Sequence, residues 1–162
     1  SVDGAIVPHG FMPGFPSINL FDDSWVCLTD HHNDRLSDPA TPEQLQQLPW
    51  VALMEGVTHC APPTRQLRIM GVDPHIEVAT NSFLAAPAYV RETDRVVILP
   101  ARLESYVSFT GLRVARCPDG VRHLGTAFIW HPLHDNDPGH HWMRSLLVEA
   151  AALLPEPNER YR

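Results

Sequence analysis

Short runs of apolar residues alternate along the chain with stretches in which polar residues predominate. A short, continuous apolar run is typical of a β-strand covered on both faces, because neither side of such a strand meets water. The predicted strands are Asp3–Val7, the aromatic-rich part of Ile18–Leu28, Trp50–Met54, His75–Ala79, Arg95–Leu99 and Thr126–Trp130. The segments His9–Ser17 and Thr29–Ala40 are rich in polar or turn-forming residues and are predicted to be loops.

Residues that initiate helices follow several of these strands. Thr41 is a suitable N-cap, and Gln44 stands where a capping box needs it. Asp137 followed by Pro138 is a similar start, since proline suits the first helical position. The predicted helices are a short one from Pro42 to before Pro49, one from Pro62 to Gly71, one over Phe83–Arg91 that Pro87 should kink or shorten, one over Pro100–Val107, and one from Gly139 to about Leu154 with a broad apolar face formed by Trp142, Leu146, Val148, Ala150, Leu153 and Leu154.

The alternation of strands and helices indicates an α/β fold. We expect a Rossmann-like mixed, mostly parallel sheet with helices on both faces. In such a sheet, ligands bind at the carboxyl ends of the strands, where turns lead into helices. Two predicted turns occupy such positions, Gly56–His59 and Thr80–Phe83.

These two turns carry short polar side chains suited to a small anion. Thr58 and His59 offer a hydroxyl and an imidazole, and Asn81 and Ser82 offer polar groups beside backbone N–H donors. Such a set would suit a carboxylate. On spacing alone, an equally good interpretation is that these residues only cap helices.

Composition narrows the class of protein. The chain has 162 residues, a formal net charge of −7 and 44% hydrophobic residues, which fits a folded domain. All of its basic residues are arginine, so chemistry that needs lysine is excluded. The charge gives no indication of a basic face for nucleic acid, and no apolar run approaches the ~20 residues of a membrane-spanning helix. Cys27, Cys60 and Cys117 are an odd number of widely spaced cysteines, which favours free thiols in a reducing cytoplasm.

The sequence gives no enzyme signature, and neither a metal site nor a cofactor is predicted. The adjacent pair His31-His32 could chelate an ion in a loop, but adjacent side chains diverge in regular structure, and His140-His141 lie in the first turn of the last predicted helix, where neighbours do not share a face. A thiol- or metal-dependent enzyme built on His59, Cys60 or the histidine pairs remains an alternative. No Gly-x-Ser-x-Gly or Gly-x-Gly-x-x-Gly motif supports a hydrolase or a dinucleotide-binding protein.

The segment Phe128–Arg144 carries the most specific signal in the chain. It contains Trp130-His131, an Asp-Pro-rich turn, and a helix with Trp142-Met143-Arg144, and it resembles the closing signature of LysR-type transcriptional regulators. Further landmarks of that family appear upstream in the same order. They are Asp3-Gly4-Ala5-Ile6, Trp25-Val26-Cys27-Leu28, Leu48-Pro49-Trp50-Val51-Ala52-Leu53 and Val96-Val97-Ile98-Leu99-Pro100.

The resemblance covers nearly the whole chain and looks closest to the subgroup that answers aromatic or nodulation-type effectors. It implies an effector-binding domain with type 2 periplasmic-binding-protein architecture, one lobe complete and one partial. Residues 1–28 would be the remnant of the first lobe and a crossing strand, 29–125 the second lobe, and 126–162 the return strand and the last helix of the first lobe. The effector contacts implied by the resemblance are Asn33, Thr58, His59, Thr80, Asn81, Ser82 and Phe83.

The resemblance also implies partners. We expect a cytoplasmic regulator without enzymatic activity or membrane contact that senses a small molecule, an aromatic or other carboxylate. The full-length protein would be a homodimer or tetramer and would contact operator DNA only through an N-terminal helix-turn-helix domain that this sequence lacks. The incomplete first lobe should expose strand edges and favour association. A periplasmic-type solute-binding protein for transport is the alternative, and the sequence upstream of Ser1 would distinguish the two.

Overall fold

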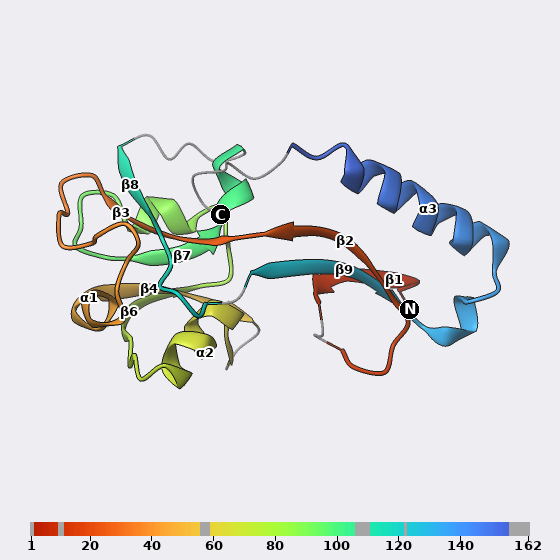
Figure 1. Cartoon of the computed structure of the whole chain (residues 1–162), viewed down its shortest axis with the longest axis horizontal. Coiled ribbons are helices and arrows are strands. Elements are labelled where there is room, and N and C mark those ends of the chain that lie inside the picture. The colour runs from red at the N-terminus through yellow and green to blue at the C-terminus, as the bar shows by residue number, and fades with distance from the viewer. Residues whose placement is uncertain (1, 10–11, 56–58, 106–110, 122, 156–162) are drawn as a thin grey trace. The chain divides into compact units, whose positions relative to one another are not determined.

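The computed structural model describes the chain except for residues 1, 10–11, 56–58, 106–110, 122 and 156–162, and except for the side chains of Glu55, His59, Cys60 and Ser105. The chain divides into two compact units (Figure 1). Unit 1 consists of the described residues of 1–23 and 123–157, and unit 2 consists of the described residues of 24–122. Among the described residues, no helix combines the length and apolar character needed to cross a membrane.

Unit 1 is an antiparallel sheet with one long helix. Its strands are β1 (Gly4–Pro8), β2 (Ser17–Asp23) and β9 (Leu124–Trp130), and β9 lies in the centre with β1 and β2 on either side. After β9, a 3-10 turn, η3 (Pro132–His134), leads to the helix α3 (Pro138–Ala152), which packs against β2. These strands and the last helix confirm elements that the sequence predicts.

The start of α3 follows the predicted capping, but its apolar face does not meet the sheet as expected. The Oδ1 atom of Asp137 accepts the backbone N–H of His140 at 2.7 Å. The buried residues of α3 are His140 and Arg144, whereas Trp142 is 66% exposed. The guanidinium of Arg144 lies 4.4 Å from the centre of the Trp130 ring. The most deeply buried side chains of the helix are therefore an imidazole and a guanidinium, which a count of apolar positions does not reveal.

Unit 2 contains the remaining strands and two α-helices. Its elements are β3 (Trp25–Asp30), α1 (Pro42–Gln47), β4 (Pro49–Glu55), β5 (His59–Cys60), α2 (Pro62–Ile69), β6 (His75–Thr80), η1 (Ala86–Tyr89), β7 (Val97–Pro100), η2 (Ala101–Ser105) and β8 (Leu112–Arg116). The strands form the sheets β7-β3-β8 and β5-β4-β6, and a parallel bridge between Trp50 and Val96 links them.

The prediction of a mostly parallel sheet is wrong. Among the described residues, β4 and β6 are the one parallel pair of strands, and the bridge from Trp50 to Val96 is the other parallel contact. The central strands β3 and β9 are antiparallel to both of their neighbours. An apolar run indicates that a strand is covered but carries no information on its direction, and parallel pairs need a crossover such as α2 between β4 and β6.

The local signals for α1 and α2 are confirmed. The side chains of Thr41 and Gln44 each accept the other residue's backbone N–H, which completes the capping box of α1. Gly71 follows the C-cap of α2 with φ of +91°, a conformation that suits glycine.

Two predicted helices are only 3-10 turns, and two strands were not predicted, β8 and the two-residue β5. The segment Phe83–Arg91 forms the four-residue η1, because Pro87 has no N–H to continue an α-helix. The segment Pro100–Val107 contains the five-residue η2. The strand β8 combines arginine with partly buried apolar residues, so no continuous apolar run marks it.

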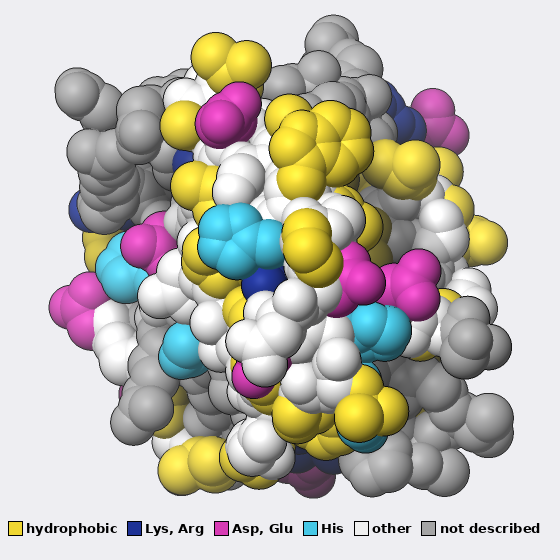
Figure 2. Space-filling model, turned by 90° about the vertical axis from the view of Figure 1, so that its right-hand side faces the viewer, with side chains coloured by type: hydrophobic (Ala, Val, Ile, Leu, Met, Phe, Trp, Pro, Cys, Tyr) yellow, Lys and Arg dark blue, Asp and Glu magenta, His cyan; other side chains and the backbone are white. Residues whose placement is uncertain are grey.

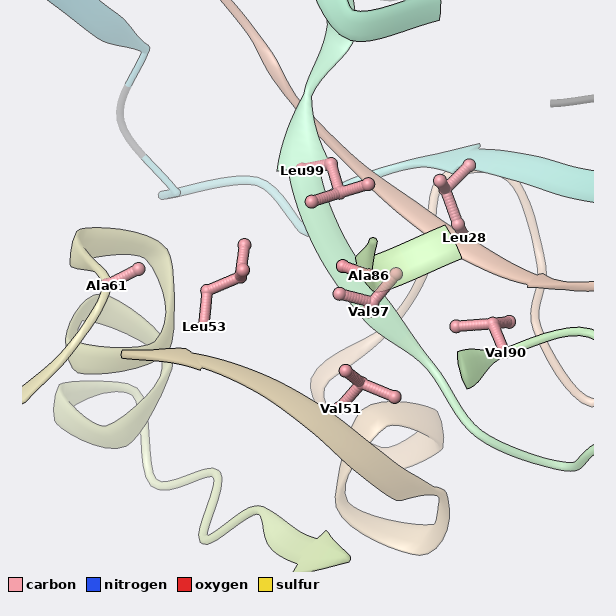
Figure 3. Packing of buried hydrophobic residues seen from close by; sticks show 8 residues of the cluster. All are labelled: Leu28, Val51, Leu53, Ala61, Ala86, Val90, Val97 and Leu99. Atoms are coloured by element: carbon pink, nitrogen blue, oxygen red, sulfur yellow. The ribbon is translucent and has the colours of Figure 1, made fainter. Parts of the chain in front are cut away.

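The core of unit 2 joins strands to η1. Its buried cluster consists of Leu28, Val51, Leu53, Ala61, Ala86, Val90, Val97 and Leu99 (Figure 3). Ala86 and Val90 come from the two ends of η1, so this short turn is anchored against β4 and β7.

The surface seen in Figure 2 carries hydrophobic side chains dispersed among acidic and histidine side chains, with few cationic ones.

Candidate functional site

The parallel pairing of β4 and β6 defines one edge of the β5-β4-β6 sheet. Leu53 on β4 is the register partner of Thr80, the last residue of β6. Because the strands are parallel, both carboxyl ends point to this edge, where ligands commonly bind in α/β sheets. The polar turn that starts at Thr80 therefore lies next to the end of β4.

Two interlocking turns hold the residues after β6. The Oγ1 atom of Thr80 accepts the backbone N–H of Ser82 at 3.2 Å, and the Oγ atom of Ser82 accepts the N–H of Ala85 at 3.2 Å. The carbonyl oxygen of Ser82 accepts the N–H of Ala86 at 3.1 Å. These contacts use oxygen lone pairs, so each hydroxyl keeps a hydrogen that can be donated to a ligand.

The turn is fixed at both ends but does not open a regular helix. Thr80 is set by the register with Leu53, and Ala86 is fully buried in the core. In place of the expected α-helix, the structure has only the four-residue 3-10 turn η1. A helix macrodipole needs several aligned peptide units, so a four-residue turn offers little of one. The hydrogen-bond donors that this turn can offer to a ligand are mainly the side-chain hydroxyls.

The side chains around the two hydroxyls differ in exposure. Asn81 is exposed, Thr80 and Ser82 are half-buried, and the Phe83 side chain is partly exposed, at 37%. The carboxylate of Glu77 on β6 accepts a hydrogen bond from Nε of Arg95 at 2.9 Å. The turn thus offers two hydroxyls, an amide and an aromatic surface.

Asn33 is held inside unit 2. It is 5% exposed, its Nδ2 atom donates to the carbonyl oxygen of Asp94 at 3.2 Å, and its Oδ1 atom accepts the N–H of Arg35 at 3.1 Å. Both polar ends of the side chain are therefore engaged in the protein. In this structure Asn33 fixes the loop after β3 against the segment that precedes β7.

The turn at Gly56–His59 is largely outside the described residues. Thr58 is among the residues that are not described, and for His59 only the backbone is described, as the partner of Glu55 in the pairing of β4 with β5. The structure therefore brings together Thr80, Asn81, Ser82 and Phe83 and gives no side-chain position for Thr58 or His59.

Two groups of reactive side chains lie elsewhere in unit 2. The Sγ atoms of Cys27 and Cys117 are 3.5 Å apart, and both thiols are free. Burial is the main cause that raises the pKa of the Cys117 thiol, and its hydrogen bond to Cys27 adds to the effect. At the end of β3, Asp30, His31 and His32 bring three potential metal-ligand atoms within 4.8 Å of one another. The separate sequence positions of the cysteines gave no signal for their contact. The adjacency of His31 and His32 was a signal for chelation in a loop, but nothing in the sequence linked Asp30 to the pair.

Comparison with known proteins identifies the family. The LysR substrate binding domain family matches residues 1–152. Nodulation protein D 2 of Rhizobium tropici is 32% identical over 164 residues, covering 99% of this chain and 52% of that protein. The chain thus spans about half the length of this curated relative.

Solved structures agree with the fold. A probable transcriptional regulator from Pseudomonas aeruginosa has a TM-score of 0.77 at 20% identity, over 90% of this chain and 49% of that one. Full-length CbnR complexed with its target DNA has a TM-score of 0.71 at 13% identity, over 94% of this chain and 54% of that one.

The chain belongs to the LysR substrate binding domain family. This confirms the resemblance seen in the sequence, and it places the chain in a family of binding domains, not of enzymes. The alternative of a solute-binding protein for transport is not favoured by these relatives.

Proposed function

We propose that this chain binds a small molecule, an aromatic or other carboxylate, as the effector-sensing part of a LysR-type regulator. The observation that carries the proposal is the parallel register of Leu53 with Thr80, which sets the polar turn Thr80–Phe83 at a carboxyl edge of the sheet. Family membership supports a binding role, and the chemistry of the turn supports the class of ligand.

Each residue of the turn has a proposed role. The hydroxyls of Thr80 and Ser82 donate to the carboxylate oxygens, and Asn81 adds an amide donor. The partly exposed ring of Phe83 packs against the apolar part of the effector. Thr58 and His59 would contribute from the segment after β4, and Asn33, whose amide is engaged by Asp94 and Arg35, would position the neighbouring loop.

The full-length protein would convert this binding into control of transcription. We infer that binding shifts the equilibrium between arrangements of a dimer or tetramer, since a ligand can act at a distance only through its different affinity for two states. Contact with operator DNA would come from a separate N-terminal helix-turn-helix domain. This chain covers 54% of full-length CbnR, which forms a complex with its target DNA, and this supports contact with DNA by the full-length protein.

Calorimetry on the 162-residue chain tests the proposal. The titrants are benzoate, 4-hydroxycinnamate and succinate, each paired with its neutral amide. We expect saturable heat with at least one aromatic carboxylate and weaker binding of its amide, because the amide lacks the charge that strengthens the hydrogen bonds. Absence of saturable binding for all three acids would overturn the ligand class.

A pair of variants at one position tests the site. Thr80→Val removes the hydroxyl at nearly constant shape, and Thr80→Ser keeps it. Loss of one hydrogen bond to a charged ligand is worth about 1.5–3 kcal/mol, so we expect Thr80→Val to weaken binding by at least tenfold and Thr80→Ser to retain it. Ser145→Ala on α3 is the matched control for a hydroxyl outside the turn. Equal affinities for Thr80→Val and the control would remove the turn from the binding site.

A further inference from the structure

A second group of ligating side chains lies where β3 ends. Asp30 is the last residue of this strand, and His31 and His32 follow it directly. Three ligand atoms, one from each side chain, lie within 4.8 Å of one another. The carboxylate is buried and the two imidazoles are exposed, so the group has a fixed anionic base and two accessible nitrogen donors.

The carboxylate of Asp30 is held in place by the backbone. Its Oδ1 atom accepts the N–H of His32 at 3.0 Å, and its Oδ2 atom accepts the N–H of Glu92 at 2.8 Å. These two hydrogen bonds lower the pKa of Asp30, so the group is ionised at neutral pH. Each carboxylate oxygen has two lone pairs, so each retains one for a further partner.

The histidines are arranged by the same turn. The carbonyl oxygen of Gly111 accepts the backbone N–H of His31 at 3.2 Å and lies 3.0 Å from the Nδ1 atom of that residue. The centres of the His31 and His32 rings are 3.6 Å apart, with an angle of 41° between the ring planes. The His31 side chain is 54% exposed, so an ion can reach it from solvent.

The spacing is near that of a tetrahedral site. The carbonyl oxygen of Gly111 can only accept, so the Nδ1 atom of His31 carries the ring proton in this contact and Nε2 is the nitrogen left for an ion. Bonds of about 2.0–2.1 Å to zinc place neighbouring ligand atoms roughly 3.4 Å apart. One ligand atom from each of the three side chains lies within 4.8 Å of the others, which is wider than this spacing, so the exposed His32 side chain has to rotate to close the site around an ion.

We propose that Asp30, His31 and His32 form a binding site for a divalent transition-metal ion, with Zn²⁺ as the reference ion and water completing the coordination. Two imidazoles and one carboxylate suit zinc and its neighbours, whereas Mg²⁺ and Ca²⁺ prefer oxygen ligands alone. The ion binds the nitrogen of each neutral imidazole that carries no proton, and a protonated imidazolium must first release one proton to solvent.

Isothermal titration of Zn²⁺ into the 162-residue chain, prepared without a polyhistidine tag, tests this site. We expect one saturable step with a stoichiometry of one, and no comparable step with Mg²⁺. Loss of even an outer-shell partner commonly weakens metal binding about 10- to 100-fold, so His31→Gln and His32→Gln should each weaken it by at least about tenfold. Both side chains are exposed, so circular dichroism should show both variants folded.

The matched control is another histidine beside a carboxylate. The Nε2 atom of His75 lies 3.9 Å from the Oε1 atom of Glu77 on β6, and His75→Gln should leave the zinc affinity unchanged. A thermal shift gives a second readout, since a ligand that binds only the folded state raises the melting temperature. Zinc should raise it in the unaltered chain and in His75→Gln, but not in the His31 and His32 variants. Equal zinc binding by all of these proteins, or no saturable step in the unaltered chain, would overturn the proposed site.

Discussion

Leu53 on β4 and Thr80 on β6 are partners in a parallel register, at the point where β6 ends. Leu53 is buried in the core together with Ala86, the first residue of η1. The turn between Thr80 and Ala86 is thus bounded on one side by the register of the sheet and on the other by the core. A polar turn that is fixed in this way can present its hydroxyls without a large ordering cost on binding.

The capping box of α1 should be measurable as stability. Thr41→Ala removes the acceptor for the N–H of Gln44, and loss of an N-cap side chain typically costs about 1 kcal/mol. We expect the free energy of unfolding in urea to fall by this amount, and Thr41→Ser to restore most of it. An unchanged midpoint in Thr41→Ala would mean that the Oε1 atom of Gln44, which also accepts from Ser37, holds this segment without the cap.

Two glycines should respond to alanine in different ways. At Gly71, with φ of +91°, a Cβ would meet no atom within 4 Å, so Gly71→Ala should cost about 1 kcal/mol of backbone strain alone. At Gly4 a Cβ would lie 2.2 Å from the ring of Phe128 and 2.7 Å from the carbonyl oxygen of Ile129. Gly4→Ala should therefore destabilise the protein more strongly in thermal unfolding, by about 3 kcal/mol. The opposite order of the two variants would contradict the packing of β1 on β9.

Arg144 should contribute to stability through both its charge and its flat shape. Its NH2 nitrogen donates to the carbonyl oxygen of Asp135 at 3.0 Å, and its guanidinium lies over Trp130. Arg144→Met leaves that carbonyl without this donor and should cost about 2 kcal/mol in urea unfolding. Arg144→Lys keeps the charge but lacks the planar group, so its free energy of unfolding should lie between those of the unaltered chain and of Arg144→Met. A lysine variant as stable as the unaltered chain would indicate that stacking on Trp130 contributes nothing.

The thiol of Cys117 should react slowly and with a shifted pH dependence. Its pKa lies well above the ordinary value of 9.0, because burial and the contact with Cys27 disfavour the thiolate. The thiolate is the reactive form, so the rate of alkylation by iodoacetamide at pH 8 should be below that of glutathione. The rate should continue to rise above pH 9, and peptide mapping by mass spectrometry can follow this residue separately. A rate that levels off below pH 9 would contradict a raised pKa.

Local signals in the sequence predicted local structure well. Thr41 with Gln44, and Asp137 before Pro138, identify the starts of α1 and α3 because a cap depends on residues within one helical turn. The strand directions were not predictable in this way. Whether β3 runs parallel or antiparallel to β7 depends on how the chain returns over 66 residues between Asp30 and Val97, and the apolar run of β3 is the same in both cases.

The candidate site was predictable in part, because part of it is formed by residues that are neighbours in the sequence. The turn from Thr80 to Phe83 follows from the position of its polar residues after an apolar strand, and the partner strand β4 follows from the crossover α2. Chelation by His31 and His32 in a loop was weighed, but a metal site was not predicted, because adjacent side chains diverge in regular helices and strands and nothing in the sequence linked Asp30 to the pair. In the structure the N–H groups of His32 and Glu92 bond to Asp30 where β3 ends, and the ring centres of His31 and His32 lie 3.6 Å apart there, which no pattern in the sequence indicates.

The most direct test of the central claim is an NMR titration of the ¹⁵N-labelled chain with benzoate, followed through the backbone amides. If the turn after β6 binds the carboxylate, the amide signals of Asn81, Ser82 and Phe83 should shift progressively and saturate together, and in Thr80→Val the same shifts should need at least about tenfold more benzoate. Saturable shifts confined to other parts of the chain, or none at these three residues, would contradict the account.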